Sequence, residues 1–239
     1  MDMSQYYVRE APVSVHGSNL DMVNALFRKV YQWMAGGLIL TAAVAYGVAS
    51  SRYALSILLS PMVFVLLAAE LGLVWYLSAR IERVSPGTAS GLFIAYSLLN
   101  GVTLSAVLLV YEQGSVYNAF LSTAGMFGLM SVYGLYAQRD LTSMGSFLRM
   151  GLWGLIIAMV INLFLASSMM DFYISVFGVI IFLGLTAWDT QKIRNMAYEL
   201  EGGEDGEMTR KAAIMGALAL YLDFINLFIH LLRLFGKRR

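Results

Sequence analysis

Cysteine is absent from this chain of 239 residues, and histidine occurs only twice. The lack of thiols excludes disulfides and thiolate chemistry, and it removes the cysteine ligands of the usual zinc site. His16 and His230 alone are too few for a histidine-rich metal site. We therefore expect no bound cofactor.

Charged residues are also scarce, at 13% of the chain, whereas 59% of the residues are apolar and the mean hydropathy is +0.69. A soluble domain of this length cannot bury so much apolar surface in one core, but a lipid bilayer solvates it. The net charge is +1, and the one basic run is Lys237–Arg239 at the C-terminus. These features predict an integral membrane protein embedded in the lipid bilayer, and they argue against a nucleic-acid partner.

Seven apolar stretches are each long enough to cross a bilayer as a helix, which takes roughly 20 mostly apolar residues. They cover residues 30–50, 57–79, 89–110, 117–137, 147–169, 172–191 and 212–235. The first 29 residues are polar and do not resemble a cleavable signal peptide, because the apolar stretch begins too late and runs too long. The sequence thus predicts an all-α protein with a tail of residues 1–29 and one transmembrane domain of residues 30–239.

The links between these stretches are short and hold charged or turn-forming residues. Pro61 lies in the first turn of the second stretch, where its missing N–H costs little. We expect a tight turn around Asp171 between the fifth and sixth helices. The longest link, residues 194–211, is acidic. No linker divides the chain into two domains.

Lysine and arginine are distributed unequally between the two sets of loops. The N-terminal tail and the second, fourth and sixth loops hold most of them, whereas the loops of the other side hold only Arg52. This asymmetry predicts a cytoplasmic N-terminus. A seventh crossing then places the basic C-terminus outside, against the bias, unless the last helix dips in and returns. We expect a full crossing, because the last stretch is long enough.

Three acidic side chains lie well inside the predicted helices: Glu70, Asp189 and Asp223. An ionisable side chain at this depth costs several kcal/mol, so each one needs a functional or structural reason. Basic residues near helix ends are instead expected to extend to the lipid headgroups. These are Arg80, Arg149 and Arg233.

Asp189 and Asp223 would form a pH sensor if they met. Two close carboxyl groups in a low dielectric cannot both ionise, so they share a proton and titrate as a pair. Asn226 lies three residues after Asp223 and shares its helical face. Residue counting leaves the contact open, because Asp189 lies roughly 7–8 Å and Asp223 roughly 18 Å from the same interface at 1.5 Å per residue. Two separate protonated acids are the alternative.

Two sequence motifs surround these aspartates. The seventh predicted helix carries LYLDFINLF at Leu220–Phe228, followed by LLR at Leu231–Arg233, and the sixth carries LTAWDTQKI at Leu185–Ile193. Together with the seven predicted spans, these motifs resemble the Bax inhibitor-1 family, the transmembrane Bax-inhibitor-motif proteins. The absence of cysteine and the short tails are similar to those of a bacterial member. This resemblance implies a location in the bacterial inner membrane.

The resemblance also implies a fold and an activity. The fold is six helices that surround a central C-terminal helix. The activity is a pH-sensitive calcium leak, gated by a hydrogen-bonded pair of Asp189 and Asp223 onto which an arginine of the second helix latches. Arg80 and Arg83 bracket the expected position of this arginine, and Glu70 fits a glutamate that helps to line the ion path.

Calcium is then the transported ion rather than a resident cofactor. It takes six to eight oxygen ligands, and Asp189, Asp223, Glu70, Asn226 and waters supply some of them without forming a tight cage. Such weak coordination suits conduction, because the ion has to leave the site again.

Two other functions remain open. The first is a non-transporting regulator that binds a membrane-protein partner, either a protease or a cell-death protein, as members of this family are described to do. The second is an intramembrane aspartyl protease, which also pairs two aspartates. A resemblance to such a protease would require a Gly-x-Gly-Asp pattern in the second of the two helices. Here the bulky Tyr221 and Leu222 precede Asp223 instead. We therefore expect that the protein is not an enzyme.

Overall fold

The structure is a computed structural model that describes residues 15–81, 83–200 and 206–239. Within these ranges the chain is almost entirely helical, and seven helices are long and apolar enough to cross a membrane. The helices are α1 (Val15–Ala49), α2 (Ala54–Leu58), α3 (Met62–Arg80), α4 (Pro86–Val110), α5 (Gln113–Tyr136), α6 (Thr142–Leu165), α7 (Ser168–Glu199) and α8 (Gly206–Phe235). The all-α fold with seven transmembrane helices is thus confirmed.

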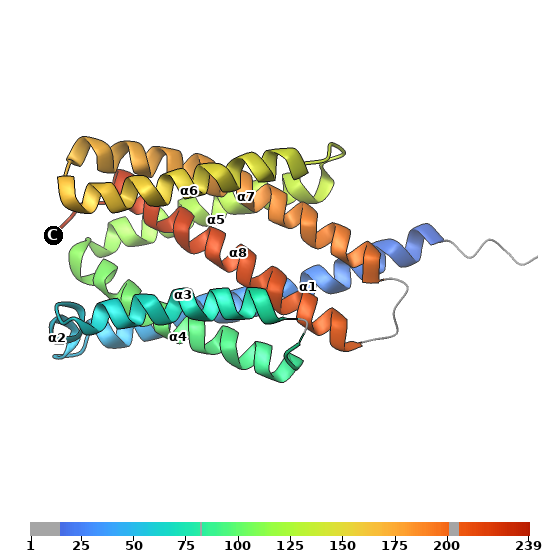
Figure 1. The fold of residues 1–239 in the computed structure, drawn as a ribbon, viewed down its shortest axis with the longest axis horizontal. Helices are drawn as coiled ribbons and strands as arrows, with labels where there is room; N and C mark the ends of the chain where they lie inside the picture. The colour runs from blue at the N-terminus through green and yellow to red at the C-terminus, as the bar shows by residue number, and fades with distance from the viewer. Residues whose placement is uncertain (1–14, 82, 201–205) are drawn as a thin grey trace, which may run out of the picture.

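The last helix, α8, runs obliquely through the middle of the bundle (Figure 1). Its most apolar window is 67% buried, whereas the corresponding windows of the other spans are at most 33% buried. Helices α1, α4, α5 and α7 pack directly against α8, while α3 packs mainly on α4 and α6 mainly on α7. The expected central C-terminal helix is therefore present, with four neighbours in contact and two helices further out.

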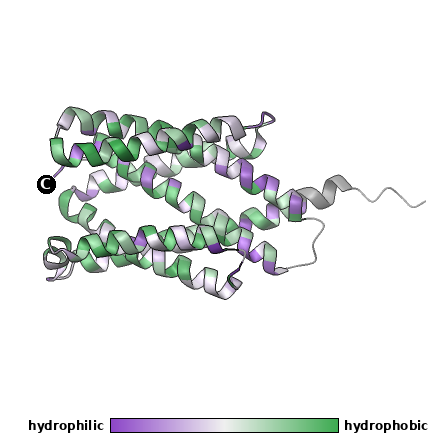
Figure 2. Ribbon diagram, in the orientation of Figure 1, coloured by the Kyte–Doolittle hydropathy of each residue, from purple (hydrophilic) through white to green (hydrophobic). Residues whose placement is uncertain are grey.

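Large apolar side chains cover the outer faces of the bundle. Phe64 and Trp75 of α3 and Trp153 and Phe164 of α6 are strongly exposed. Along the middle of the bundle the residues are mostly hydrophobic, and hydrophilic residues gather at the end where α7 ends and α8 begins (Figure 2). Such an apolar belt with polar ends is what a bilayer requires of the helices that it surrounds.

Two helix boundaries differ from the predictions, and both differences have a local cause. Pro61 immediately precedes α3, and the predicted span 57–79 is broken there into α2 and α3, because proline cannot donate a helical hydrogen bond. The expected turn around Asp171 is wrong. Helix α6 ends at Leu165. The next residue, Ala166, has a φ of 49°, and the Ser167 side chain accepts a hydrogen bond from the Met170 amide.

Asp171 consequently lies in the first turn of α7, where a negative charge interacts favourably with the helix dipole. Three other helices extend well beyond their predicted stretches. Helix α1 begins at Val15, within the expected tail of residues 1–29. Helix α7 continues to Glu199 and α8 begins at Gly206, both within the predicted acidic link. Residues 1–14 of the tail and residues 201–205 of the link lie outside the described residues.

The C-terminus lies at the end of the bundle opposite to the start of α1 (Figure 1). Its residues pair with the turn between α4 and α5. The Glu112 amide donates to the Lys237 carbonyl at 3.0 Å, and the Arg239 amide donates to the Val110 carbonyl at 2.9 Å. Helix α8 thus crosses the whole bundle, as expected, and does not return.

Helix α7 is bound tightly to the turn between α5 and α6. The Leu141 amide donates to Oε1 of Gln191 at 2.8 Å, and Nε2 of Gln191 donates to the Arg139 carbonyl at 2.8 Å. Arg194 donates to the Leu135 carbonyl, also at 2.8 Å. These bonds satisfy the carbonyls at the end of α5, and they join α5, α6 and α7 within two turns of Asp189.

Close packing of α5 on α7 depends on Gly134, whose backbone lies directly against the carbonyl group of Ala187. Gly134→Val is expected to lower the unfolding midpoint in detergent, because overpacking costs about 1–3 kcal/mol. Gly125→Val is the matched control, since Gly125 lies on the same helix and a Cβ there meets nothing within 4 Å. Equal midpoints of the two variants would contradict this account of the packing.

Candidate functional site

Asp189 of α7 and Asp223 of α8 meet inside the bundle. The two carboxyl groups are close enough to act on each other electrostatically, although no direct hydrogen bond joins them in the described structure. Asp223 is only 4% exposed, and its Oδ2 is buried without a hydrogen-bond partner in the described structure. Asp189 is partly buried. Helix α8 runs obliquely past α7 (Figure 1), so the two acids meet although they lie at different numbers of residues from the helix ends.

The positive charges that act on Asp189 come from Lys192, one turn further along α7, and from Arg149 of α6. Both cations also lie over the indole ring of Trp188. The Arg149 guanidinium carbon is 4.7 Å and the Lys192 ammonium nitrogen 5.5 Å from its ring centroid. Asp223, by contrast, is acted on by the charge of Asp189 and by no cation among the described residues. The pair is thus asymmetric, with one acid near cations and the other deeply buried.

The two arginines that bracket the expected latch position are not brought to this pair. The side chains of Arg80 and Arg83 are exposed, and neither acts electrostatically on Asp189 or Asp223 in the described structure. The reason lies in the packing of α3, which lies mainly on α4 and buries Leu77 in its last turns. The end of α3 therefore carries both arginines away from α7.

Glu70 of α3 belongs to a second buried polar cluster, and its own side chain is 8% exposed. Thr103 donates to its Oε1 at 2.8 Å, and Nδ2 of Asn100 donates to its Oε2 at 3.4 Å. Asn100 in turn accepts from the Tyr221 hydroxyl at 3.0 Å, and this hydroxyl lies 2.6 Å from Oγ1 of Thr41. Hydrogen bonds thus connect α3, α4, α1 and α8.

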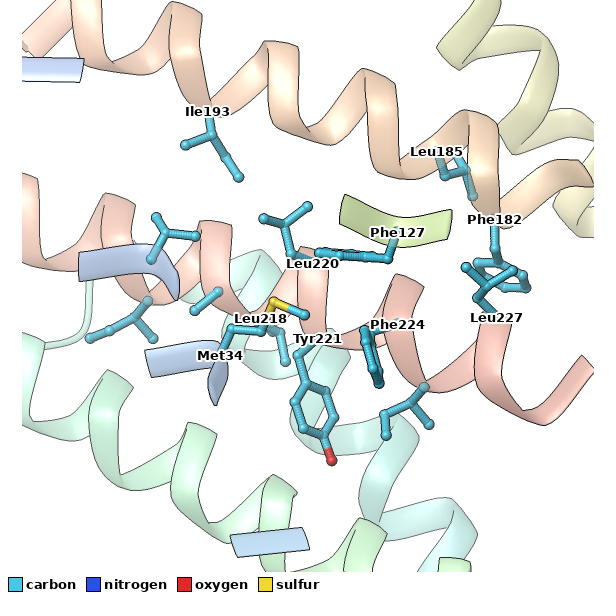
Figure 3. Packing of buried hydrophobic residues seen from close by; sticks show 14 of the residues in the cluster. Met34, Phe127, Phe182, Leu185, Ile193, Leu218, Leu220, Tyr221, Phe224 and Leu227 are labelled. Atoms are coloured by element: carbon cyan, nitrogen blue, oxygen red, sulfur yellow. The ribbon is translucent and has the colours of Figure 1, made fainter. Parts of the chain in front are cut away.

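Tyr221 lies two residues before Asp223 and is fully buried. Its ring projects from α8 beside the apolar cluster, and its hydroxyl points away from Leu220 and Phe224 (Figure 3). The same helix thus carries one acid toward α7 and one phenol toward α1 and α4. The sequence analysis did not single out Tyr221 or Thr41. Asn100 and Thr103, three residues apart inside an apolar helix, were a visible signal of a polar face.

Asn226 does not reach the acid pair. Its Nδ2 donates to the Leu222 carbonyl of its own helix at 2.8 Å. No three acidic or histidine side chains converge on a metal site anywhere in the described ranges. A calcium ion at Asp189 and Asp223 would consequently take most of its ligands from water, which fits weak binding.

Beyond Asp223, toward the C-terminal end of α8, the seam between α7 and α8 is apolar. Leu185 and Phe182 of α7 and Leu227 of α8 come together there (Figure 3), and all three are buried. Phe182 also stacks on His230, with 5.7 Å between the ring centroids. The acid pair is therefore separated from this end of the bundle by a layer of buried apolar side chains.

Tyr221→Phe is expected to destabilise the protein by about 1–2 kcal/mol, because Asn100 and Thr41 lose a buried partner. Thermal unfolding in detergent measures the effect. Tyr96→Phe is the matched control, since Tyr96 is buried with its ring 5.7 Å from that of Tyr221 and its hydroxyl makes no hydrogen bond in the described structure. The cluster has no stabilising role if both variants unfold at the same temperature.

Comparison with known proteins agrees with this architecture. The family model described as "Inhibitor of apoptosis-promoting Bax1" matches residues 23–239. The chain is 46% identical to the inner membrane protein YbhL of Escherichia coli over 213 aligned residues. This alignment covers 88% of this chain and 91% of YbhL. Uncharacterized proteins of Borreliella burgdorferi and Deinococcus radiodurans are each 45% identical, with coverage of 90% and 92% of this chain and 93% of each relative. The chain therefore belongs to the Bax inhibitor-1 family of membrane proteins.

Proposed function

We propose that this protein is a pH-sensitive calcium leak channel of the bacterial inner membrane, with its N-terminus in the cytoplasm. The protonation state of the Asp189–Asp223 pair sets the conductance. The observation that carries the proposal is the close approach of two acidic side chains, one of them almost fully buried, between α7 and α8. Membership of the Bax inhibitor-1 family supports the general kind of protein.

The switch follows from elementary electrostatics. With one shared proton the two carboxyl groups form a hydrogen bond and hold α7 against α8. Loss of this proton leaves two negative charges at close range in a poorly polarisable environment, where they repel strongly. The same charges attract a divalent cation, which takes oxygen ligands. Deprotonation therefore both loosens the seam and creates a weak calcium site.

The conformation described here corresponds to a closed channel. A hydrated ion at the pair meets the apolar layer of Phe182, Leu185 and Leu227, and apolar constrictions of this kind exclude water and ions. Opening requires α7 to move relative to α8 so that this layer parts. Because α5 and α6 are bound to α7 through Gln191 and Arg194, we expect these three helices to move together.

The arginine latch belongs to a different conformation in this proposal. Arg80 or Arg83 reaches the pair only if the end of α3 moves toward α7. In the closed conformation Arg149 and Lys192 supply the positive charge near Asp189. Glu70 adds a second negative group on the path, linked to α8 through Asn100 and Tyr221.

Protein reconstituted in liposomes is expected to leak calcium down its gradient, at a rate that changes steeply between about pH 6 and 8. Asp189→Asn and Asp223→Asn are each expected to flatten this dependence, because an amide does not titrate. An indicator dye trapped inside the liposomes measures the flux. A pH-independent leak in the wild type, or wild-type profiles in both variants, would remove the proposed gate.

Asp171→Asn is the matched control for these two variants. Asp171 lies on the same helix as Asp189 but at its other end, where it accepts a hydrogen bond from Asn162 at 2.7 Å. It is expected to keep the wild-type profile. A flattened profile in this control would indicate a general effect of charge on the helix rather than a role of the pair.

Glu70→Gln is expected to lower the calcium flux several-fold without removing its pH dependence. The amide keeps the shape of the side chain and an acceptor for Thr103, but it loses the negative charge that attracts the cation. Glu112→Gln, at an exposed position before α5, is the control with the same chemical change. Equal fluxes in the two variants would exclude Glu70 from the ion path.

A further inference from the structure

Trp188, Arg149 and Lys192 form a basic cluster on the outside of α6 and α7, with Trp188 at its centre. The Trp188 ring lies directly on Gly145 of α6, where no side chain fits. Arg149, one turn after Gly145, and Lys192, one turn after Trp188, both lie over this ring. The two basic side chains are exposed, and neither forms a direct ion pair with an acid in the described part of the chain.

The cluster lies at the depth of the lipid headgroups. Trp188 is 20 residues after Ser168, where α7 begins, which is about 30 Å along the helix and equals the thickness of the hydrocarbon core. Arg149 lies 16 residues before the end of α6 at Leu165, or about 24 Å, and its long side chain extends the remaining distance. Tryptophan at this level is typical of membrane interfaces.

A pocket of about 310 Å³ opens beside the indole ring. Lys192, Thr142 and Asn195 line it and offer hydrogen-bond donors. Its one acidic lining residue, Glu199, follows Trp188 by 11 residues, or about 16 Å along α7, and thus lies beyond the headgroup plane. The volume is at the lower limit of the roughly 300–1,000 Å³ of small-molecule sites.

We propose that Arg149, Lys192 and Trp188 form a binding site for the headgroup of an anionic phospholipid, with phosphatidylglycerol as the simplest ligand. The two cations bind the phosphodiester anion through charge-assisted hydrogen bonds. Thr142 and Asn195 bind the headgroup hydroxyls, and an acyl chain lies along the exposed apolar side chain of Trp153, one turn after Arg149 on α6. A zwitterionic headgroup fits less well, because its ammonium group meets two further positive charges.

The binding test uses the purified full-length protein in a neutral detergent and no flux measurement. Phosphatidylglycerol, phosphatidylcholine and inorganic phosphate are added in separate titrations, and the shift of the thermal unfolding midpoint gives the apparent affinity. Phosphatidylglycerol is expected to raise the midpoint more than phosphatidylcholine does. R149Q/K192Q is expected to reduce the affinity for phosphatidylglycerol by roughly tenfold or more, since each basic residue near a headgroup contributes about a factor of five.

R28Q/K29Q is the matched control, because Arg28 and Lys29 are an exposed arginine and lysine on α1 and their removal changes the net charge equally. It is expected to keep the wild-type affinity. Equal losses in both double variants would overturn a defined site in favour of general surface charge. Stabilisation by inorganic phosphate to the same extent would overturn the assignment to a lipid. R149K/K192R keeps both positive charges and is expected to bind phosphatidylglycerol more tightly than R149Q/K192Q does. Equally weak binding by the two variants would contradict a role of the charges themselves.

Discussion

The close approach of two acidic side chains inside the helix bundle is the feature on which the rest of this account depends. Asp223 is almost fully buried, and within the described part of the chain the charge that acts on it is that of Asp189, so in the proposed switch the two groups share a proton. This requirement explains why α8 is central. A helix at the centre of the bundle keeps its acid away from lipid, and only a neighbour in direct contact can bring the second acid to it. Asp189 of α7 does so, with Arg149 and Lys192 close by.

Helix α8 is held on two sides by different chemistry. Asp223 connects it to α7, which α5 and α6 join through Gln191 and Arg194. Tyr221 connects it to α1 and α4 through Thr41 and Asn100. In the proposed switch, the first connection depends on a shared proton, whereas the bonds of Tyr221 with Thr41 and Asn100 join groups that are uncharged near neutral pH. A change of pH would then act mainly on the side of α8 that faces α7 and would turn a local titration into a relative movement of two helix groups.

Much of this arrangement could be predicted from the sequence. The apolar stretches predict the seven spans because lipid permits only fully hydrogen-bonded helices, and acids inside such stretches are conspicuous. The contact of Asp189 with Asp223 could not be derived by counting residues, because it depends on the oblique course of α8. The position of Arg80 and Arg83 depends on which helix α3 packs against. The hydrogen-bond cluster of Tyr221 is formed with residues of three other helices, so it cannot be predicted from one helix alone. Local backbone chemistry at Pro61 and Ala166 moved two helix boundaries.

Infrared spectroscopy of the carboxyl groups in a pH titration tests the shared proton most directly. The wild-type protein is predicted to show a protonated carboxyl band near neutral pH that disappears as the pH rises. This band should be absent or strongly shifted in both Asp189→Asn and Asp223→Asn and unchanged in Asp171→Asn. A band that persists in both pair variants and disappears in Glu70→Gln would contradict the account, because the proton would then reside on Glu70 and the two aspartates would share nothing.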